Sequence, residues 1–303
     1  MFKFYILWSD FINNLEAVTS NLPHDNTVVI INTLDDEQRD VGVNFCKEHS
    51  IEHYVTESDG TPATGKNSLL EKFLESDNQY MVAIDGDDFL TPYGVYLYQE
   101  LAKHESPPDM VCLYRQLSVR GCHPDVFLEE RPNLIPYIPE LPFDKTNVTL
   151  EYGELVKLFT DPDEKYKRPL EVAQEWALNR LEFDSFMKKY SESNEFLCRL
   201  VFHSRKVAEM MRYTNELYVG EDAVQFFKLK KQALDGNIKM MRRKEIGNFT
   251  YIYNKNQNSI MRGMYKDDWG WCITLLDVLY NDEDILSLPE RVSLPEFEDS
   301  EWV

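Results

Sequence analysis

The amino-acid sequence predicts an α/β protein with a mainly parallel sheet that is covered by helices on both faces. Over the first hundred residues, short apolar runs alternate with segments whose apolar residues recur at helical spacing. The composition, with 43% apolar and 13% aromatic residues in 303, can fill one large core or a core with a small second lobe. We therefore expect ligands to bind where the parallel strands end.

Four strands and three helices are predicted in this first part. The strands are rich in branched and aromatic residues and cover 3–8, 27–32, 51–57 and 80–84. The helices cover 9–22, 38–50 and 66–76, with a loop from Gly60 to Gly65 before the third. Residues at or just beyond the strand ends are candidates for ligand contact: Trp8, Asn32, Glu57 and Asp85.

The chain changes character after Ser106. Seven prolines between 107 and 142 disfavour long regular elements, so a loop-rich insertion is expected there. Helical spacing returns at 171–190 and 220–234, and 248–253 has the pattern of a late strand. The acidic end, 281–303, is predicted to be an extended tail with little core of its own.

The net charge of −21 opposes general affinity for nucleic acid. The segment 199–244 departs from this balance, with eleven Lys and Arg against five Asp and Glu. Such a cluster is either a solvated helix face or a local site for an anion. Both interpretations remain open from the sequence.

Localisation and redox state follow from simple counts. No segment approaches the roughly 18 apolar residues of a membrane span, and Asp10 interrupts the apolar start, so we expect a soluble cytoplasmic protein without membrane contact. The five cysteines are scattered and form no Cys-x-x-Cys pair. They are expected to be reduced thiols in the core.

The stretch "GTPATGKNS" (60–68) is close to a phosphate-binding P-loop but departs from it twice. Asn67 stands where the motif needs the Ser or Thr hydroxyl that ligates Mg²⁺. Pro62 has no backbone N–H to offer a phosphate. A P-loop-like NTPase is therefore the disfavoured alternative.

The cluster Asp85-Gly86-Asp87-Asp88 directly follows the fourth predicted strand. Carboxylate oxygens at that edge suit Mg²⁺ or Mn²⁺, which can neutralise a diphosphate. Phe89 stands where an EF-hand loop needs an oxygen ligand, which argues against a calcium site of that kind. The alternative is a turn whose aspartates only cap the next helix.

Four motifs in order resemble the inverting glycosyltransferases of the GT-A fold, in particular family 2. They are "ATGKNSLL" as the helix start, "YMVAIDGDDFLTP" as the metal strand, "NELYVGEDAVQFF" as the Glu-Asp motif and "YIYNKNQNSI" as the late aromatic strand. The resemblance covers residues 1 to about 100 and 195 to 262. It implies a nucleotide-binding unit at 1–105 and, in the same domain, an acceptor-binding part at 106–280.

The resemblance also implies chemical roles. Asp87 would be the main metal ligand, with Asp85 touching the sugar-nucleotide or sharing the Mn²⁺ or Mg²⁺, and Asp88 supporting the turn. Asp222 would be the catalytic base that takes the proton of an acceptor hydroxyl. The metal would stabilise the departing diphosphate of the donor, expected to be a UDP-sugar.

Four further residues are expected to contact the donor. Trp8 and Asn32 would meet the base and ribose, Lys66 would reach the nucleotide, and Arg262 would help to neutralise the diphosphate. Asn32 stands where the family usually has Asp, which leaves base recognition open. The Gln-x-x-Arg-Trp motif of processive polysaccharide synthases is absent, so transfer of single sugars is expected.

The acceptor is predicted by analogy of composition. The acidic composition rich in Asn, Lys, Phe and Tyr looks like that of enzymes of large tailed bacteriophages, which glycosylate hydroxymethylated bases in their own DNA. By this analogy the basic segment 199–244 would hold duplex DNA near Asp222 and a base would flip out. A cell-surface glycan, a protein or a small molecule are alternative acceptors, and a non-catalytic sugar-nucleotide-binding module is the alternative without turnover.

Overall fold

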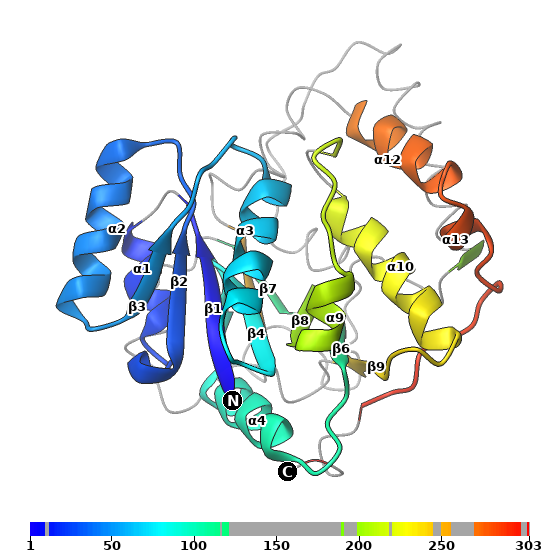
Figure 1. The fold of residues 1–303 in the computed structure, drawn as a ribbon, viewed down its shortest axis with the longest axis horizontal. Helices are drawn as coiled ribbons and strands as arrows, with labels where there is room; N and C mark the ends of the chain where they lie inside the picture. The colour runs from blue at the N-terminus through cyan, green and yellow to red at the C-terminus, as the bar shows by residue number, and fades with distance from the viewer. Residues whose placement is uncertain are drawn as a thin grey trace.

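The computed structural model describes residues 1–9, 12–115, 117–120, 189–190, 199–217, 220–244, 250–255, 270–297 and 302. Its centre is a seven-stranded sheet in the order β3-β2-β1-β4-β8-β6-β9, with helices on both faces (Figure 1). The predicted α/β class with a mainly parallel sheet is confirmed.

The first four strands are parallel and lie close to their predicted positions. They are β1 (Phe2–Trp8), β2 (Thr27–Ile31), β3 (Glu52–Val55) and β4 (Tyr80–Asp85). The connecting helices are α1 (Ile12–Thr19), α2 (Asp36–Glu48) and α3 (Pro62–Glu75). Because β1 is flanked by β2 and β4, the order of the strands reverses at β1. In sheets of this kind, ligands bind at the carboxyl ends of the strands beside such a reversal.

Helix α3 begins earlier than predicted. The Thr61 side chain accepts a hydrogen bond from the Thr64 N–H, and Pro62 occupies the first turn. A Thr N-cap followed by Pro is a strong helix start, since Pro lacks an N–H that would be unpaired there in any case. The expected loop from Gly60 to Gly65 is thus mostly the first turn of a helix.

The other half of the sheet was not predicted. β8 (Arg199–Ser204) runs antiparallel between β4 and β6 (Met110–Arg115), and β9 (Met240–Lys244) continues beside β6. Because β8 is antiparallel to β4, its first residue, Arg199, lies at the edge where β4 ends. The remaining described helices are α4 (Pro92–Lys103), α9 (Arg205–Met210), α10 (Glu221–Leu234), α12 (Gly270–Tyr280) and α13 (Glu283–Leu286).

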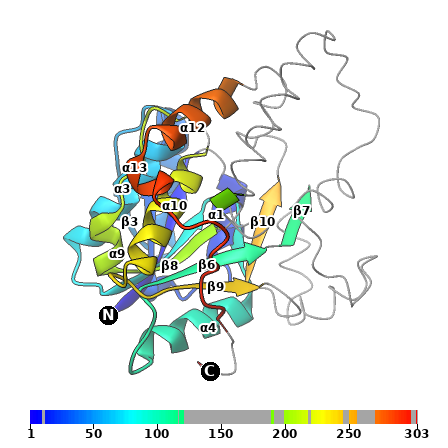
Figure 2. The same cartoon turned by 90° about the vertical axis from the view of Figure 1, so that its right-hand side faces the viewer.

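A small second sheet, in the order β5-β10-β7, lies beside the acidic turn. It consists of β5 (Phe89–Leu90), β10 (Tyr251–Lys255) and β7 (Leu117–Arg120). Figure 2 shows β7 and β10 side by side, apart from the main sheet. β10 corresponds to the late strand predicted at 248–253.

The main sheet separates two apolar clusters. One face packs Tyr5 and Val28 against Phe73 of α3 and Phe227 of α10. The opposite face packs residues of β1 and β2 against α1, α2 and α4. Burial on both faces explains why these strands read as continuous apolar runs.

The acidic C-terminal segment contributes more to the core than predicted. Ile285, Leu288, Leu294 and Phe297 are each at most 4% exposed, and the Phe297 N–H donates to the Arg242 carbonyl at 2.6 Å. Their apolar side chains anchor the segment despite the surrounding acidic residues.

The structure describes the side chains of two of the five cysteines, and most of the predicted helices. Cys46 and Cys112 are buried free thiols, as predicted for core cysteines. None of the described helices combines the length and apolarity that a bilayer crossing requires. The predicted helix at 171–190 lies outside the described residues, apart from its last two positions.

Candidate functional site

The acidic turn lies directly against the end of β1. Asp85 ends β4, and the Asp88 N–H closes the turn by donating to the Asp85 carbonyl at 3.0 Å. A Cβ on Gly86 would lie 2.7 Å from the Leu7 carbonyl oxygen and 2.9 Å from the Trp8 Cα. Only glycine therefore lets the turn approach β1 this closely.

Asp88 supports the turn from inside. Its side chain is fully buried and accepts a hydrogen bond from the Tyr251 hydroxyl at 2.8 Å. The same hydroxyl accepts the Asp85 N–H at 3.2 Å. Burial raises the pKa of Asp88 well above its ordinary value, although Arg199 acts in the opposite direction. Strand β10 thus holds the turn through one tyrosine.

Arg199 is the cation of this turn. Its guanidinium donates to Asp85 Oδ2 and lies 3.2 Å from Asp88 Oδ2. The rings of Tyr251 and Tyr253 lie 5.0 and 5.1 Å from it. Burial opposes ionisation of Asp85, but Arg199 and Lys66 lower its pKa below the ordinary value. Sequence reasoning missed Arg199 because only the antiparallel pairing of β8 brings it here.

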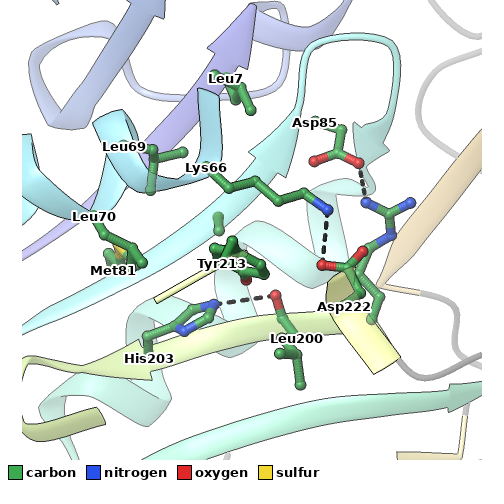
Figure 3. A pocket seen from close by; sticks show the side chains of 12 residues that line it. Leu7, Lys66, Leu69, Leu70, Met81, Asp85, Leu200, His203, Tyr213 and Asp222 are labelled. Carbon is green, nitrogen blue, oxygen red and sulfur yellow. Dashed lines mark hydrogen bonds and ion pairs between the residues drawn. The ribbon is translucent and has the colours of Figure 1, made fainter. Parts of the chain in front are cut away.

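Lys66 connects the first half of the chain to the predicted base. Its Nζ lies 2.7 Å from Asp222 Oδ1 (Figure 3). The same Nζ lies 2.6 Å from Glu221 Oε1. Burial favours the neutral amine, but Asp222 and Glu221 raise the pKa of Lys66 well above its ordinary value. Burial and the charge of Asp222 raise the pKa of Glu221 above its ordinary value, although Lys66 acts in the opposite direction. Lys66 therefore stays charged between two carboxylates.

Asp222 lies in the first turn of α10, where a negative charge is favoured by the helix dipole. Gly220 is the N-cap before the helix, and its φ of 93° favours glycine. The Asp222 side chain is 40% exposed, in contrast to 6% for Glu221. Of the two neighbouring acids, Asp222 is therefore the one that a ligand can reach.

One pocket joins the two acidic motifs. Asp85, Lys66, Arg199 and Asp222 all line it, although they come from distant parts of the sequence (Figure 3). Its other walls are mostly apolar: Leu7, Leu69, Leu70, Met81, Ala83, Leu200, His203 and Tyr213. The two carboxylates whose roles the family resemblance implied thus share a single site.

His203 is an unpredicted polar residue in this wall. Burial lowers its pKa to about 4, so the ring is neutral at physiological pH. Nε2 lies 3.1 Å from the Leu200 carbonyl, which makes it the protonated nitrogen (Figure 3). Nδ1 has no hydrogen-bond partner within the described part of the chain.

The rest of the "TGKN" stretch fastens α3 to the segment before α10. The Asn67 amide donates to the Tyr213 carbonyl and accepts its N–H, both at 2.9 Å. Thr64 Oγ1 accepts from Asn215 at 3.2 Å. The Gly65 N–H bonds to the Thr61 carbonyl within the helix. These contacts join two chain segments and leave the Gly65 N–H paired, unlike the phosphate cradle of an NTPase.

The predicted donor-contact residues differ in position. Trp8 is 1% exposed, and its ring packs against Gly42 of α2. Asn32 is 4% exposed and donates to Thr56 Oγ1 at 2.9 Å and to the Glu57 carbonyl at 2.8 Å, which ties β2 to β3. Lys66 faces the carboxylates described above. Arg262 lies outside the described residues.

The acidic turn has the chemistry of a shared metal site. Asp85 and Asp87 are both partly exposed at the strand end. Among the described residues no three His, Cys, Asp or Glu side chains lie together as a complete metal cage. Mg²⁺ is commonly held by one or two carboxylates together with substrate phosphates. The residues therefore fit a divalent cation that a phosphate-bearing ligand also coordinates.

Much of the basic segment 199–244 is used internally. Lys230 is fully buried and donates to the Tyr190 carbonyl, and Arg243 is 2% exposed. Arg205 donates to backbone carbonyls of α3 and the loop after it, those of Phe73, Leu74, Ser76 and Asn78. The exposed cations of the described part of this segment are Lys206, Arg212, Lys228 and Lys239.

Comparison with solved structures identifies the fold. A structure of S. aureus TarS 1–349 in complex with UDP-GlcNAc is similar over 99% of this chain and 68% of that one, with 12% identity and a TM-score of 0.51. The fold is of the GT-A type. No protein-family model matches the chain, and no curated protein matches it in sequence.

Two other solved structures are similar at lower scores. TarS 1–349 in complex with UDP matches 84% of this chain and 60% of that one, at 11% identity and a TM-score of 0.45. A mannosyltransferase from Pyrobaculum calidifontis, in complex with GDP-Man and Mn²⁺, matches 84% of this chain and 56% of that one, at 9% identity and a TM-score of 0.42. The chain thus spans less than two thirds of both of these structures.

Proposed function

We propose that this GT-A protein is an inverting glycosyltransferase of family 2 type, which moves one sugar from a nucleotide-sugar to an acceptor hydroxyl. The observation that carries the proposal is the single pocket lined by both Asp85 and Asp222. The UDP-GlcNAc complex of the similar TarS structure supports a UDP-sugar as donor. Metal dependence is supported by the partly exposed Asp85 and Asp87 at the strand end.

In the proposed mechanism, Asp222 is the catalytic base. Lys66 occupies Oδ1, so Oδ2 is the oxygen that takes the acceptor proton. The acceptor oxygen forms a bond to the anomeric carbon as the bond to the diphosphate oxygen breaks on the opposite face. The electron pair of the broken bond leaves with the diphosphate, and the configuration at carbon is inverted.

The other charged residues orient Asp222 and neutralise the departing diphosphate. Lys66 holds the Asp222 side chain by a 2.7 Å ion pair and anchors on the buried Glu221. Asp85 and Asp87 would hold Mg²⁺ or Mn²⁺, which supplies charge neutralisation to a departing diphosphate. Arg199 adds a second positive charge at the same turn.

The test is nucleotide release from UDP-sugars, with and without Mn²⁺ and without added acceptor. We expect slow hydrolysis that requires Mn²⁺ and is abolished by Asp87→Ala. In an assay of sugar transfer to an acceptor, Asp222→Asn should lower turnover by about 10²–10⁴-fold, the usual contribution of a general base, while UDP binding is retained. Glu209→Gln, an exposed acid on α9, serves as the control.

Three outcomes would contradict parts of the proposal. UDP binding without turnover of any donor would indicate a non-catalytic sugar-nucleotide-binding module. Full activity of Asp222→Asn would remove the base assignment. Nucleoside triphosphate hydrolysis in place of sugar release would favour the NTPase alternative.

The acceptor is a separate part of the proposal. The hydroxymethyl group of modified cytosine in phage DNA stays a prediction, because much of the basic segment that motivated it is buried or paired. A cell-surface glycan, a protein or a small molecule remain the other acceptors to assay. A mass-spectrometric screen of UDP-sugars against plain and hydroxymethylated DNA separates the first hypothesis from the others.

A further inference from the structure

The two partners of Arg199 differ in accessibility. Asp88 is fully buried and is also held by the Tyr251 hydroxyl, so its position is fixed from inside the protein. The Asp85 side chain is 35% exposed and lines the pocket. A ligand can therefore replace Asp85 as a partner of Arg199 without exposing the buried Asp88 side chain.

Arg199 is also fixed in orientation. Two tyrosine rings lie about 5 Å from its guanidinium carbon, and its side chain is 15% exposed. A planar guanidinium has five N–H donors in a rigid fork that matches carboxylate and phosphate oxygens equally well. A guanidinium anchored on Asp88 can thus exchange a carboxylate for a phosphate with little movement.

The pairing has a consequence for a divalent cation. Asp85 Oδ2, one of the oxygens expected to bind the metal, accepts a hydrogen bond from Arg199. Lys66 adds a second positive charge that acts on Asp85. A metal ion that binds alone must displace Arg199 from Asp85 and lie near the charge of Lys66. A diphosphate that binds with the metal offers Arg199 a new partner.

We propose that Arg199 holds Asp85 until nucleotide and metal bind together, and that it then transfers its hydrogen bond to the donor diphosphate. Arg199 then occupies the Asp85 oxygen before the metal binds, and it binds the diphosphate afterwards. This inference rests on the proposed function. It predicts that nucleotide and metal each bind weakly alone and tightly together.

The experiment measures binding on the full chain rather than activity. Free Mn²⁺ is followed by electron paramagnetic resonance, and UDP binding by calorimetry, each with and without the other ligand. In the wild type, UDP should tighten Mn²⁺ binding by tenfold or more. In Arg199→Met, Mn²⁺ binding without UDP should tighten, and UDP binding in the presence of Mn²⁺ should weaken. Each change should be roughly tenfold, the effect of one charge-assisted hydrogen bond.

A rise in Mn²⁺ affinity together with a fall in UDP affinity distinguishes the proposal from a purely structural role of Arg199. In a structural role, both affinities would fall together. Arg199→Lys keeps the charge but lacks the fork, so intermediate values are expected. Lys206→Met makes the same charge change at an exposed position on α9 and should alter neither affinity. Unchanged or weaker Mn²⁺ binding in Arg199→Met overturns the inference.

The wild type alone keeps the inference testable if the Met variant does not fold. Equal Mn²⁺ affinity with and without UDP would overturn it. If the wild type binds UDP and Mn²⁺ but Arg199 has no influence on either, the inference fails and the proposed function stands. If it binds neither ligand, both fail.

Discussion

At the scale of single residues, the site is a set of carboxylates that share two cations. Lys66 bridges Glu221 and Asp222, and Arg199 bridges Asp85 and Asp88. The acids were recognisable in the sequence, because they occur in compact motifs after a strand and at a helix start. Their partners were not, since Lys66 was expected at the nucleotide and Arg199 carried no local motif.

The buried position of Glu221 makes the role of Lys66 measurable through pH. We expect Lys66→Met to leave Glu221 buried without its cation and to raise the pKa of Glu221 further. A carboxyl with a raised folded pKa stabilises the fold below its unfolded pKa of 4.5, and this contribution is lost as the pH rises through the folded value. The loss of unfolding free energy should be about 3–5 kcal/mol near pH 8 and clearly smaller near pH 5.

Urea unfolding at both pH values measures this, with Lys72→Met as the matched control. Lys72 pairs with the exposed Glu75 on the same helix, so its loss should cost at most about 1 kcal/mol at either pH. The same small cost for both variants would show that Glu221 does not depend on Lys66.

At the scale of elements, α3 determines where the two halves of the site meet. Its first turns carry Thr64, Lys66 and Asn67, which contact Asn215, Asp222 and Tyr213 respectively. The helix was predicted from its apolar spacing, but its start was placed four residues late, because the Thr61-Pro62 cap was read as a loop. The motif that resembled a P-loop is instead a connection between the two halves.

The Asn67 pairing gives a test of this connection. Asn67→Ala should leave the N–H and C=O of the buried Tyr213 without partners, at roughly 1–3 kcal/mol for each group. The hydrogen-exchange rate of the Tyr213 amide should rise by the factor that corresponds to this loss of free energy. Asn281→Ala, which removes an exposed bond to the Asp277 carbonyl, should change stability by less than about 0.5 kcal/mol. An equal effect of the two substitutions would argue against the connection.

At the scale of the whole molecule, the distribution of charge bears on the acceptor. A local excess of positive charge in the sequence suggested a basic face, but burial of Lys230 and Arg243 and the ion pair of Lys231 with Asp235 use part of that charge internally. Charge counted along a chain becomes a surface property only after folding.

The DNA hypothesis therefore has to be tested on exposed cations. It predicts salt-sensitive retention of duplex DNA that weakens when Lys206, Arg212 and Lys228 are replaced by Glu, with the salt slope falling by about one for each lost phosphate contact. Reversal of Lys230 or Arg243 is unsuitable, because a buried acid would unfold the protein. Retention that is unaffected by the three exposed changes would exclude Lys206, Arg212 and Lys228 as phosphate contacts.

The amino-acid sequence by itself determined the alternation of strands and helices in the first hundred residues and the acidic motifs that follow β4 and open α10. These features are local, since burial periodicity and turn residues act over a few positions. Only the tertiary structure decided that β8 lies antiparallel beside β4, that Arg199 reaches Asp85, and that Lys66 reaches Asp222. Such pairings depend on which strands become neighbours, and long-range contacts leave no signature in the spacing of residues along the chain.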